Sequence, residues 1–445
     1  MKILSILTAK ILIFMGKILG RGSVLPGSVA LKLDKNILSK LKMPKTVISV
    51  TGSSGKGSTC NLIVDIARKQ GKSVVFNDKG SNLVTGILTT LLAACNLKGE
   101  LKQDILVTEI DERYTKLLFK YLKPNYVVIT NITRDQPPRH GNFEIVYEEI
   151  KKALTKDMHL VLNADDPYTQ KFILNSQNKY TLFGIGTNKY TYNDEKFENL
   201  NIKYCPKCNS KLLYNYYHCE TLGNYYCPNC DFKRRKPLIE VTKLDYEKSF
   251  VVVNDEYKFN IPFNTLFEVY NTLAAFTIAS LINLNLDEAC NTISKMPVNL
   301  KIFNKYTYND RIVYVLNNKA ENATTYNQSL LFVKRNTELK TLIIGWKEIS
   351  RRYNFDDLSW VYDIEFELLS NNEIDKIICI GPQAYDIATR LKYANIDEEK
   401  IVVIPLIDEA VKFIKSKTKG NIYGILNFDM VEPFNNNMKG EKSGN

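Results

Sequence analysis

The 445-residue chain has few prolines and, beyond its first residues, no long apolar run. With 14 prolines and 44% hydrophobic residues, it should bury cores and not stay disordered. No run after the N-terminus reaches the ~18 apolar residues that cross a bilayer. No fixed-period repeat is present. At about 100–200 residues per domain, the length predicts two or three domains.

The N-terminus resembles a secretion signal only in part. MKILSILTAKILIFM begins like one, but Lys10 and Lys17 interrupt the apolar residues and no small-residue cleavage site follows. Apolar residues at helical spacing predict an amphipathic helix instead. These residues are Ile6, Ile11, Ile13, Met15 and Ile18. We expect a cytoplasmic protein whose basic helical segment, residues 1–45, either packs on the body or touches the inner face of a membrane.

Positive charge exceeds negative charge, with 60 Lys and Arg residues against 48 Asp and Glu, a formal balance of +12. This balance favours anionic partners such as nucleotides, nucleic acid or a membrane surface, without choosing among them. Basic residues are spread along the chain, apart from KRRK at 233–236. That cluster lacks an aromatic platform or a helix-turn-helix context, so we expect no nucleic-acid partner.

Nine cysteines are present, and four of them form two CxxC pairs separated by 18 residues. This spacing is typical of a zinc ribbon, in which four thiolates close a tetrahedral shell. A closed shell leaves no open position, so we expect zinc to support folding and not catalysis. His218 and Cys219 lie between the pairs and are not expected to be ligands. The predicted ligands are Cys205, Cys208, Cys227 and Cys230, within an inserted module at about 200–237.

Short β-branched segments alternate with helical patterns in two series. TVISV, SVVFN, DILVT, YVVIT and HLVLN form the first, and TLIIGW, KIICIG, IVVIP and NIYGILNF form the second. Such alternation predicts an α/β fold with parallel sheets covered by helices. We therefore expect a central domain over 46–298, interrupted by the ribbon, and a smaller Rossmann-like domain over 299–445.

A glycine-rich loop, TGSSGKGST, lies between the segment TVISV and a helical pattern. Inward-pointing N–H groups and the helix N-terminus together favour a phosphate group. We expect Lys56 to meet the outer phosphates of a nucleotide and Ser58, or alternatively Thr59, to bind Mg²⁺. An ordinary glycine-rich turn is the alternative. The predicted nucleotide-binding residues are Gly52, Ser53, Ser54, Gly55, Lys56, Gly57, Ser58 and Thr59.

This loop resembles the ATP loop of the Mur ligase and folylpolyglutamate synthase superfamily, whose members activate a carboxylate as an acyl phosphate and attack it with an amine. VTEIDER, TNITRDQPPRHG, LNADDP and VYNTLAAFTIA resemble further motifs of that superfamily. The resemblance implies ATP as cofactor, Glu109 as a magnesium ligand and Asn271 on the adenine side. Gln136, Glu268 and Lys301 depart from the residues that the superfamily usually carries, histidine, asparagine and arginine.

Nearly the whole chain is similar to one branch, the MurT family of lipid II isoglutaminyl synthase subunits. The four-cysteine insertion and DDLSWVYDIEFE carry this resemblance. It implies that Asp357 completes a catalytic triad with a cysteine and a histidine of a partner glutaminase, GatD. From the residue types alone a helix cap is the favoured role of Asp357, and only the resemblance reverses this preference; Asp363 is the second choice. The chain has three histidines, at 140, 159 and 218, none in a segment typical of a glutaminase, so ammonia must be free or delivered.

The resemblance implies ATP-dependent amidation of the α-carboxylate of D-glutamate in lipid II, with Lys56, Glu109 and Asp357 as catalytic residues. Two alternatives remain. One is an amino-acid-adding ligase of the Mur or folylpolyglutamate type. The other is a nucleotide-binding scaffold with weakened catalysis. Segment 317–327 supports this alternative, because it lacks the proline and glycine that the superfamily carries there.

Overall fold

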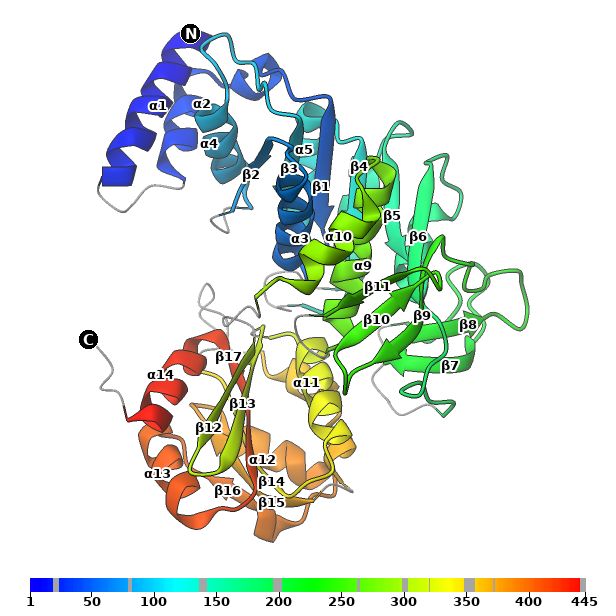
Figure 1. The fold of residues 1–445 in the computed structure, drawn as a ribbon, viewed down its shortest axis with the longest axis vertical. Helices are drawn as coiled ribbons and strands as arrows, with labels where there is room; N and C mark the ends of the chain where they lie inside the picture. Colours follow the sequence, from blue (N-terminus) through cyan, green and yellow to red (C-terminus); the bar gives the residue numbers. More distant parts are fainter. Residues whose placement is uncertain are drawn as a thin grey trace.

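The structure is a computed structural model. It describes residues 1–445 except 19–23, 79–81, 136–141, 195–201, 262–264, 298–302, 320, 348–356, 371–372 and 441–445. Figure 1 shows N-terminal helices at one end, a large α/β body beside them, and a second α/β domain at the opposite end. Gln136 and Lys301, two of the predicted departures, lie outside the described residues.

Nine strands form the larger sheet within the described residues, in the order β11-β10-β9-β6-β5-β4-β1-β3-β2. The neighbours from β9 to β2 are parallel, whereas β9, β10 and β11 pair antiparallel. The predicted strands of the first series are confirmed, and the antiparallel extension was not predicted. The strands are β1 (Thr46–Thr51), β2 (Val74–Phe76), β3 (Ile105–Glu109), β4 (Tyr126–Ile129), β5 (His159–Asn163), β6 (Tyr180–Ile185), β9 (Ile239–Asp245), β10 (Phe250–Val253) and β11 (Tyr257–Asn260).

Helices cover both faces of this sheet, as expected for buried parallel strands. Successive side chains of β1 show the two faces: Val47 joins the core beneath α4, α5 and α7, and Ile48 joins the core beneath α3, α9 and α10. The helices are α3 (Lys56–Lys69), α4 (Val84–Ala94), α5 (Thr115–Leu122), α7 (Phe143–Ala153), α8 (Pro167–Gln170), α9 (Leu266–Leu281) and α10 (Leu286–Ser294).

The predicted N-terminal helix is present as α1 (Lys2–Ile18), and it packs on α2 (Leu25–Leu33) and α4. Its predicted apolar face is wrong. Ile6 is fully buried, whereas Ile11, Met15 and Ile18 are exposed, so the five residues do not share one side of the helix. Because α1 is apolar on both sides, spacing alone did not show which side packs. Among the described residues, no helix has the length and apolarity that a bilayer crossing requires.

The cysteine module lies in the chain between β6 and β9. It contains a two-stranded antiparallel sheet of β7 (Leu213–Cys219) and β8 (Leu222–Tyr226). Tyr225 and Phe232 pack together in a small core that includes Cys205 and Cys227. So small a core fits a module that depends on a metal for stability.

The C-terminal domain holds a six-stranded sheet within the described part of the chain, in the order β12-β13-β17-β14-β15-β16. All its pairs are parallel except β12 with β13, a hairpin that was not predicted. The strands are β12 (Phe303–Tyr308), β13 (Arg311–Asn318), β14 (Lys340–Gly345), β15 (Ile374–Ile380), β16 (Ile401–Val403) and β17 (Asn421–Asn427). The helices include α11 (Ala323–Arg335), α12 (Ala384–Tyr393), α13 (Ile407–Lys417), α14 (Phe428–Lys439) and the 3₁₀ turns η4 (Ser359–Asp363) and η5 (Phe366–Leu369).

Candidate functional site

The glycine-rich loop joins the end of β1 to the start of α3, as predicted. Gly52 and Gly55 have φ of +129° and +80°, conformations that favour glycine. A Cβ on Gly52 would lie 2.2 Å from Thr130 Oγ1, and one on Gly55 would lie 2.3 Å from Asn271 Oδ1. The two glycines therefore let the loop close against β4 and α9, which brings Asn271 to the loop.

A cavity of about 400 Å³ lies between this loop and the C-terminal domain. Its volume falls within the range of small-molecule sites. Of the predicted site residues, the cavity brings together the loop from Ser53 to Ser58 with Glu109 and Asn271, whereas Gly52, Thr59 and Asp357 do not line it. The C-terminal domain contributes Leu316, Asn317, Asn318, Lys319, Thr325, Gln328 and Ser329.

Lys56 is buried and held by a carboxylate that the sequence did not single out. Its Nζ donates to Glu112 Oε1 at 2.7 Å and to the carbonyl oxygen of Gly52 at 2.5 Å. Burial alone would lower the pKa of Lys56, but the charge and hydrogen bond of Glu112 and the charges of the other nearby carboxylates together outweigh burial and raise that pKa above its ordinary value. Conversely, burial raises the pKa of Glu112, but the charges of Lys56 and Lys319 and the hydrogen bond from Lys56 together lower that pKa below its ordinary value. Both groups are therefore charged in the folded protein.

Glu109 ends β3 beside the loop. Its carboxylate Oε2 lies 3.3 Å from where a Cβ on Gly57 would stand, next to Ser58. Asn77 fixes the Glu109 backbone through two hydrogen bonds of 2.9 Å. Burial raises the pKa of the Glu109 carboxyl despite the opposing charge of Lys56. A carboxylate and a hydroxyl at the edge of one cavity form a donor set that suits Mg²⁺.

Two further predictions concern α3 and α9. Thr59 is buried and its Oγ1 donates to Asn271 Oδ1 at 3.4 Å, so Ser58, and not Thr59, faces the cavity. Glu268 also lines the cavity, and burial raises its pKa to about 7 against the hydrogen bond from Asn271. Glu268, at a position where the superfamily usually carries asparagine, therefore lies beside the cavity as an acid that is easily protonated.

Lys319 is a second lysine at the loop, and the sequence did not predict it. It follows β13 in the C-terminal domain and donates to the carbonyl oxygen of Ser53 at 2.7 Å. It also pairs with Asp135, whose other oxygen accepts from Asn322 at 3.0 Å. Its only sequence signal was its place in segment 317–327. The domain contact thus adds a positive charge to the cavity.

Asp357 lies away from the cavity, just before η4. Its Oδ1 accepts hydrogen bonds from the backbone N–H and the hydroxyl of Ser359. Burial pushes the pKa of Asp357 upward, but these bonds and the charge of Arg134 outweigh it and hold that pKa below its usual range. Asp363, the second choice, instead accepts from Arg134 Nη1 at 2.6 Å. Arg134 also bonds Ser359, and it therefore joins the loop after β4 to the DLSW segment.

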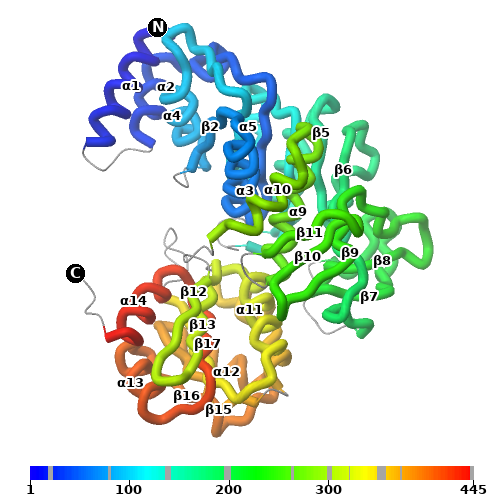
Figure 2. The backbone as a smooth tube through the Cα atoms, viewed as in Figure 1, coloured from blue at the N-terminus to red at the C-terminus, as the bar shows by residue number. Residues whose placement is uncertain are grey.

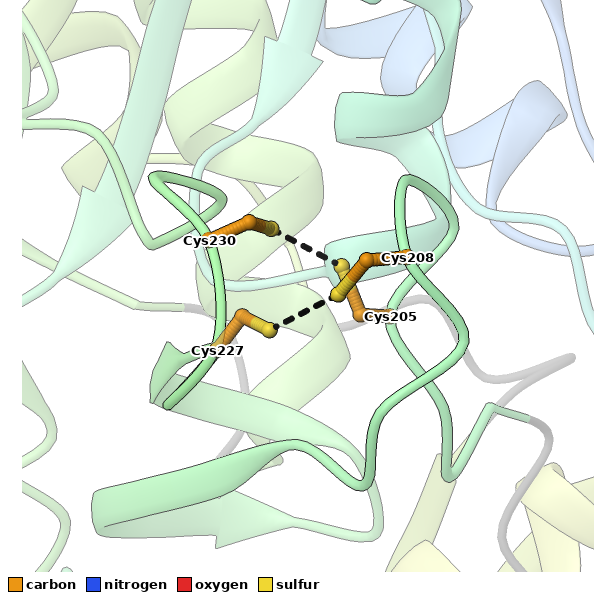
Figure 3. A group of neighbouring side chains, drawn as sticks. All are labelled: Cys205, Cys208, Cys227 and Cys230. Atoms are coloured by element: carbon orange, nitrogen blue, oxygen red, sulfur yellow. Dashed lines mark hydrogen bonds between the residues drawn. The ribbon is translucent and has the colours of Figure 1, made fainter.

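The four predicted zinc ligands converge from two loops, as Figure 3 shows. Their sulfurs lie within 4.8 Å of one another, and two of the pairs are 3.3 and 3.5 Å apart. These distances exclude disulfides, and they are near the roughly 3.8 Å between sulfurs that a tetrahedral Zn²⁺ with ~2.3 Å bonds would give. His218 instead bonds the carbonyl oxygen of Ile185, and Cys219 is buried in the main core.

The basic cluster at 233–236 is partly engaged in contacts within the protein. The Arg234 side chain is 9% exposed, and its guanidinium contacts Asp165 at 2.6 Å and Glu240 at 2.9 Å. Asp165 belongs to the LNADDP turn and also accepts from Tyr270. Arg235 donates to the Tyr180 hydroxyl. At least two of the four charges are therefore engaged within the protein.

Family models place the chain. A model of the Mur ligase middle domain matches residues 50–279, more than half of the sequence. The chain belongs to the Mur ligase family. A MurT ligase C-terminal model matches residues 319–430, so this Mur ligase has a MurT-type C-terminal domain.

Relatives extend the likeness over almost the full length of this Mur ligase. It is 29% identical over 433 residues, 95% of each chain, to "Lipid II isoglutaminyl synthase (glutamine-hydrolyzing) subunit MurT" of Staphylococcus aureus (strain COL). The protein of the same name from Streptococcus pneumoniae (strain ATCC BAA-255 / R6) is 29% identical over 424 residues, 94% of this chain and 92% of that protein. The resemblance to MurT is thereby confirmed.

Solved Mur ligase structures share the fold. A pseudomurein peptide ligase type C from Methanothermus fervidus aligns with a TM-score of 0.71 and 20% identity, covering 91% of this chain and 80% of that one. MurF from Acinetobacter baumannii aligns with a TM-score of 0.65 and 14% identity, covering 92% of this chain and 80% of that one. MurF from Thermotoga maritima, solved in complex with ADP, aligns with a TM-score of 0.59 and 16% identity, covering 93% of this chain and 84% of that one.

Proposed function

We propose that this Mur ligase is the synthetase subunit of a lipid II isoglutaminyl synthase. It would convert the α-carboxylate of D-glutamate in lipid II to the amide of D-isoglutamine, with consumption of ATP. One observation carries the proposal: the cavity gathers the glycine-rich loop, two lysines and four acidic residues at the domain contact, within a chain whose relatives carry that name.

The cavity residues suit phosphoryl transfer to a carboxylate. ATP supplies the phosphoryl group, and Ser58 and Glu109 would hold the Mg²⁺ that neutralises charge on the phosphates. A carboxylate oxygen of the substrate attacks the γ-phosphorus and ADP leaves, which gives an acyl phosphate. Ammonia then attacks the acyl carbon, phosphate leaves with the former carboxylate oxygen, and the nitrogen loses a proton. Lys56 and Lys319 would stabilise the negative charge that develops on the transferring group.

Asn271 is assigned to the adenine side of the cavity. Its place in the lining of the cavity, next to Gly55, is compatible with contact to a bound nucleotide. Zinc is assigned to the four cysteines as a structural ion. The small core of the module, which contains two of the thiols, supports a folding role.

Asp357 is proposed to orient the histidine of a partner glutaminase, GatD, which would supply ammonia from glutamine. The structure offers a physical reason to prefer Asp357 to Asp363. The Asp363 carboxylate pairs directly with Arg134, whereas Asp357 is hydrogen-bonded to the uncharged Ser359, and these bonds together with the charge of Arg134 hold its pKa low. A charged carboxylate with this support is suited to hold an imidazolium. A lipid-linked substrate would place the complex in the cytoplasm at the inner membrane face.

Amidation with ammonium chloride as the nitrogen source tests the synthetase alone. Lipid II, ATP and Mg²⁺ are incubated with the purified chain, and the product is analysed by mass spectrometry. We expect Glu109→Gln to slow amidation by at least about 100-fold. Glu148→Gln, an exposed carboxylate on α7, is the matched control and should leave the rate unchanged.

The proposal fails if Glu109→Gln amidates at the rate of the unmodified chain, or if the amide forms without ATP. A product that has gained an amino acid would instead support an amino-acid-adding ligase. Nucleotide binding without any product would support a scaffold.

A further inference from the structure

Helix α1 carries an apolar stripe on its outward side. Six large side chains recur at steps of three or four residues, which places them along one side of a helix. Each of the six is between 40 and 70% exposed. Figures 1 and 2 show α1 at the edge of the molecule, with α2 and α4 on its inner side. The outward stripe consists of Leu4, Leu7, Ile11, Phe14, Met15 and Ile18.

The other side of α1 is already packed. Ser5, Ile6 and Ala9 are fully buried, and Lys10 donates from Nζ to the carbonyl oxygen of Ala93 at the end of α4. The helix is therefore held on the body by one face while the other face remains apolar. Packing on the body, the simpler of the two roles expected for this helix, accounts for the inner face alone. A contiguous exposed apolar surface of this kind marks an interaction site.

The charge around the stripe identifies the kind of partner. Residues 1–45 contain nine Lys and Arg residues and one acidic residue, Asp34. Their net charge of +8 is most of the chain's formal excess of +12. No acidic residue occurs in α1, and helical geometry places Lys10 and Lys17 beside the stripe. An apolar face bordered by lysines is typical of helices that lie in the surface of an anionic bilayer.

We propose that α1 binds the surface of an anionic lipid bilayer, with its stripe among the acyl chains and the exposed Lys17 at the headgroups. At 17 residues with three lysines, α1 is suited to lie in the interface and not to cross it. A second copy of the chain is a poorer occupant, because pairing through α1 would bring two strongly basic segments together. The proposal names the surface that contacts lipid and does not depend on the amidation reaction.

Vesicle co-sedimentation with the full chain tests this surface separately from catalysis. Vesicles of phosphatidylcholine alone are compared with vesicles that also contain phosphatidylglycerol, at low and high salt. We expect binding to the anionic vesicles, weakened by salt. The combined variant Leu7→Gln, Ile11→Gln and Phe14→Gln should bind the anionic vesicles at least about tenfold more weakly. Each substitution removes the favourable free energy of transferring an apolar side chain from water into the bilayer.

The matched control is the combined variant Leu117→Gln and Ile145→Gln, which changes exposed apolar residues on α5 and α7. It should bind vesicles like the unmodified chain. Both variants alter exposed positions, and their circular dichroism should match that of the unmodified chain.

The proposal is overturned if the unmodified chain stays in the supernatant with anionic vesicles, or if the α1 variant binds them equally well. It is also overturned if α1 mediates self-association, seen as a dimer that the variant abolishes, without vesicle binding. Loss of vesicle binding once the glutaminase subunit is added would assign the stripe to that protein and contradict the lipid assignment.

Discussion

The buried pair of Lys56 and Glu112 predicts that removal of the loop lysine damages folding as well as activity. The side chains are only 9 and 3% exposed, and their charged atoms are 2.7 Å apart. In Lys56→Met, Glu112 would remain as an uncompensated buried charge, which costs about 3–5 kcal/mol. At about 2–4 °C per kcal/mol for a domain of this size, the melting temperature should fall by about 6–20 °C.

The double variant Lys56→Met with Glu112→Leu separates the two effects. It replaces the whole ion pair by apolar groups, a change that is often neutral or stabilising. We therefore expect the double variant to recover most of the lost stability in calorimetry. ATP turnover should stay about 100-fold or more below that of the unmodified chain, because the charge at the transferring phosphoryl group is gone.

The assay pair is differential scanning calorimetry and substrate-dependent ADP release. Melting of Lys56→Met at the temperature of the unmodified chain would refute the assignment of a buried pair. ATP turnover by the refolded double variant at the normal rate would refute the role of Lys56 in phosphoryl transfer.

Three further predictions follow from individual contacts. Burial raises the pKa of Glu220 from 4.5 to about 7. The free energy of unfolding should therefore fall as pH rises through that range, by up to about 3 kcal/mol. Glu220→Gln should have a higher melting temperature than the unmodified chain at pH 8 and a similar one at pH 5. Asp357→Asn should abolish glutamine hydrolysis by the assembled complex while amidation from ammonium chloride persists, and Asp363→Asn should retain glutamine hydrolysis. Chelation of zinc, or Cys227→Ser, should unfold the ribbon and lower the melting temperature. The control Cys290→Ser lies outside the cluster and should still bind one zinc equivalent, as measured by atomic absorption.

The features that the sequence predicted well are local in the chain. The glycine-rich loop needs only a strand, two glycines with positive φ and a helix start, and all of these lie within residues 46–59. The ribbon needs two CxxC turns at a fixed spacing. Parallel strands are buried on both faces, so their apolar segments are visible without knowledge of their neighbours.

The features that sequence reasoning missed depend on contacts between distant elements. Lys319 reaches the loop only because the C-terminal domain packs against it, and 266 residues separate it from Ser53. Arg134 lies in a quoted motif, yet its partner Asp363 is 229 residues away. The sequence grouped Ile11, Met15 and Ile18 of the outward face of α1 with the buried Ile6, because both sides of that helix are apolar and only packing distinguishes them.

The most direct test of the central claim follows an oxygen atom. Lipid II that carries isotopically heavy oxygen in the α-carboxylate of D-glutamate is incubated with the chain, ATP, Mg²⁺ and ammonium chloride. If the carboxylate is phosphorylated in the cavity around Lys56, one heavy oxygen must appear in the released phosphate for each amide formed. Amide formation with phosphate that contains no heavy oxygen would contradict the account.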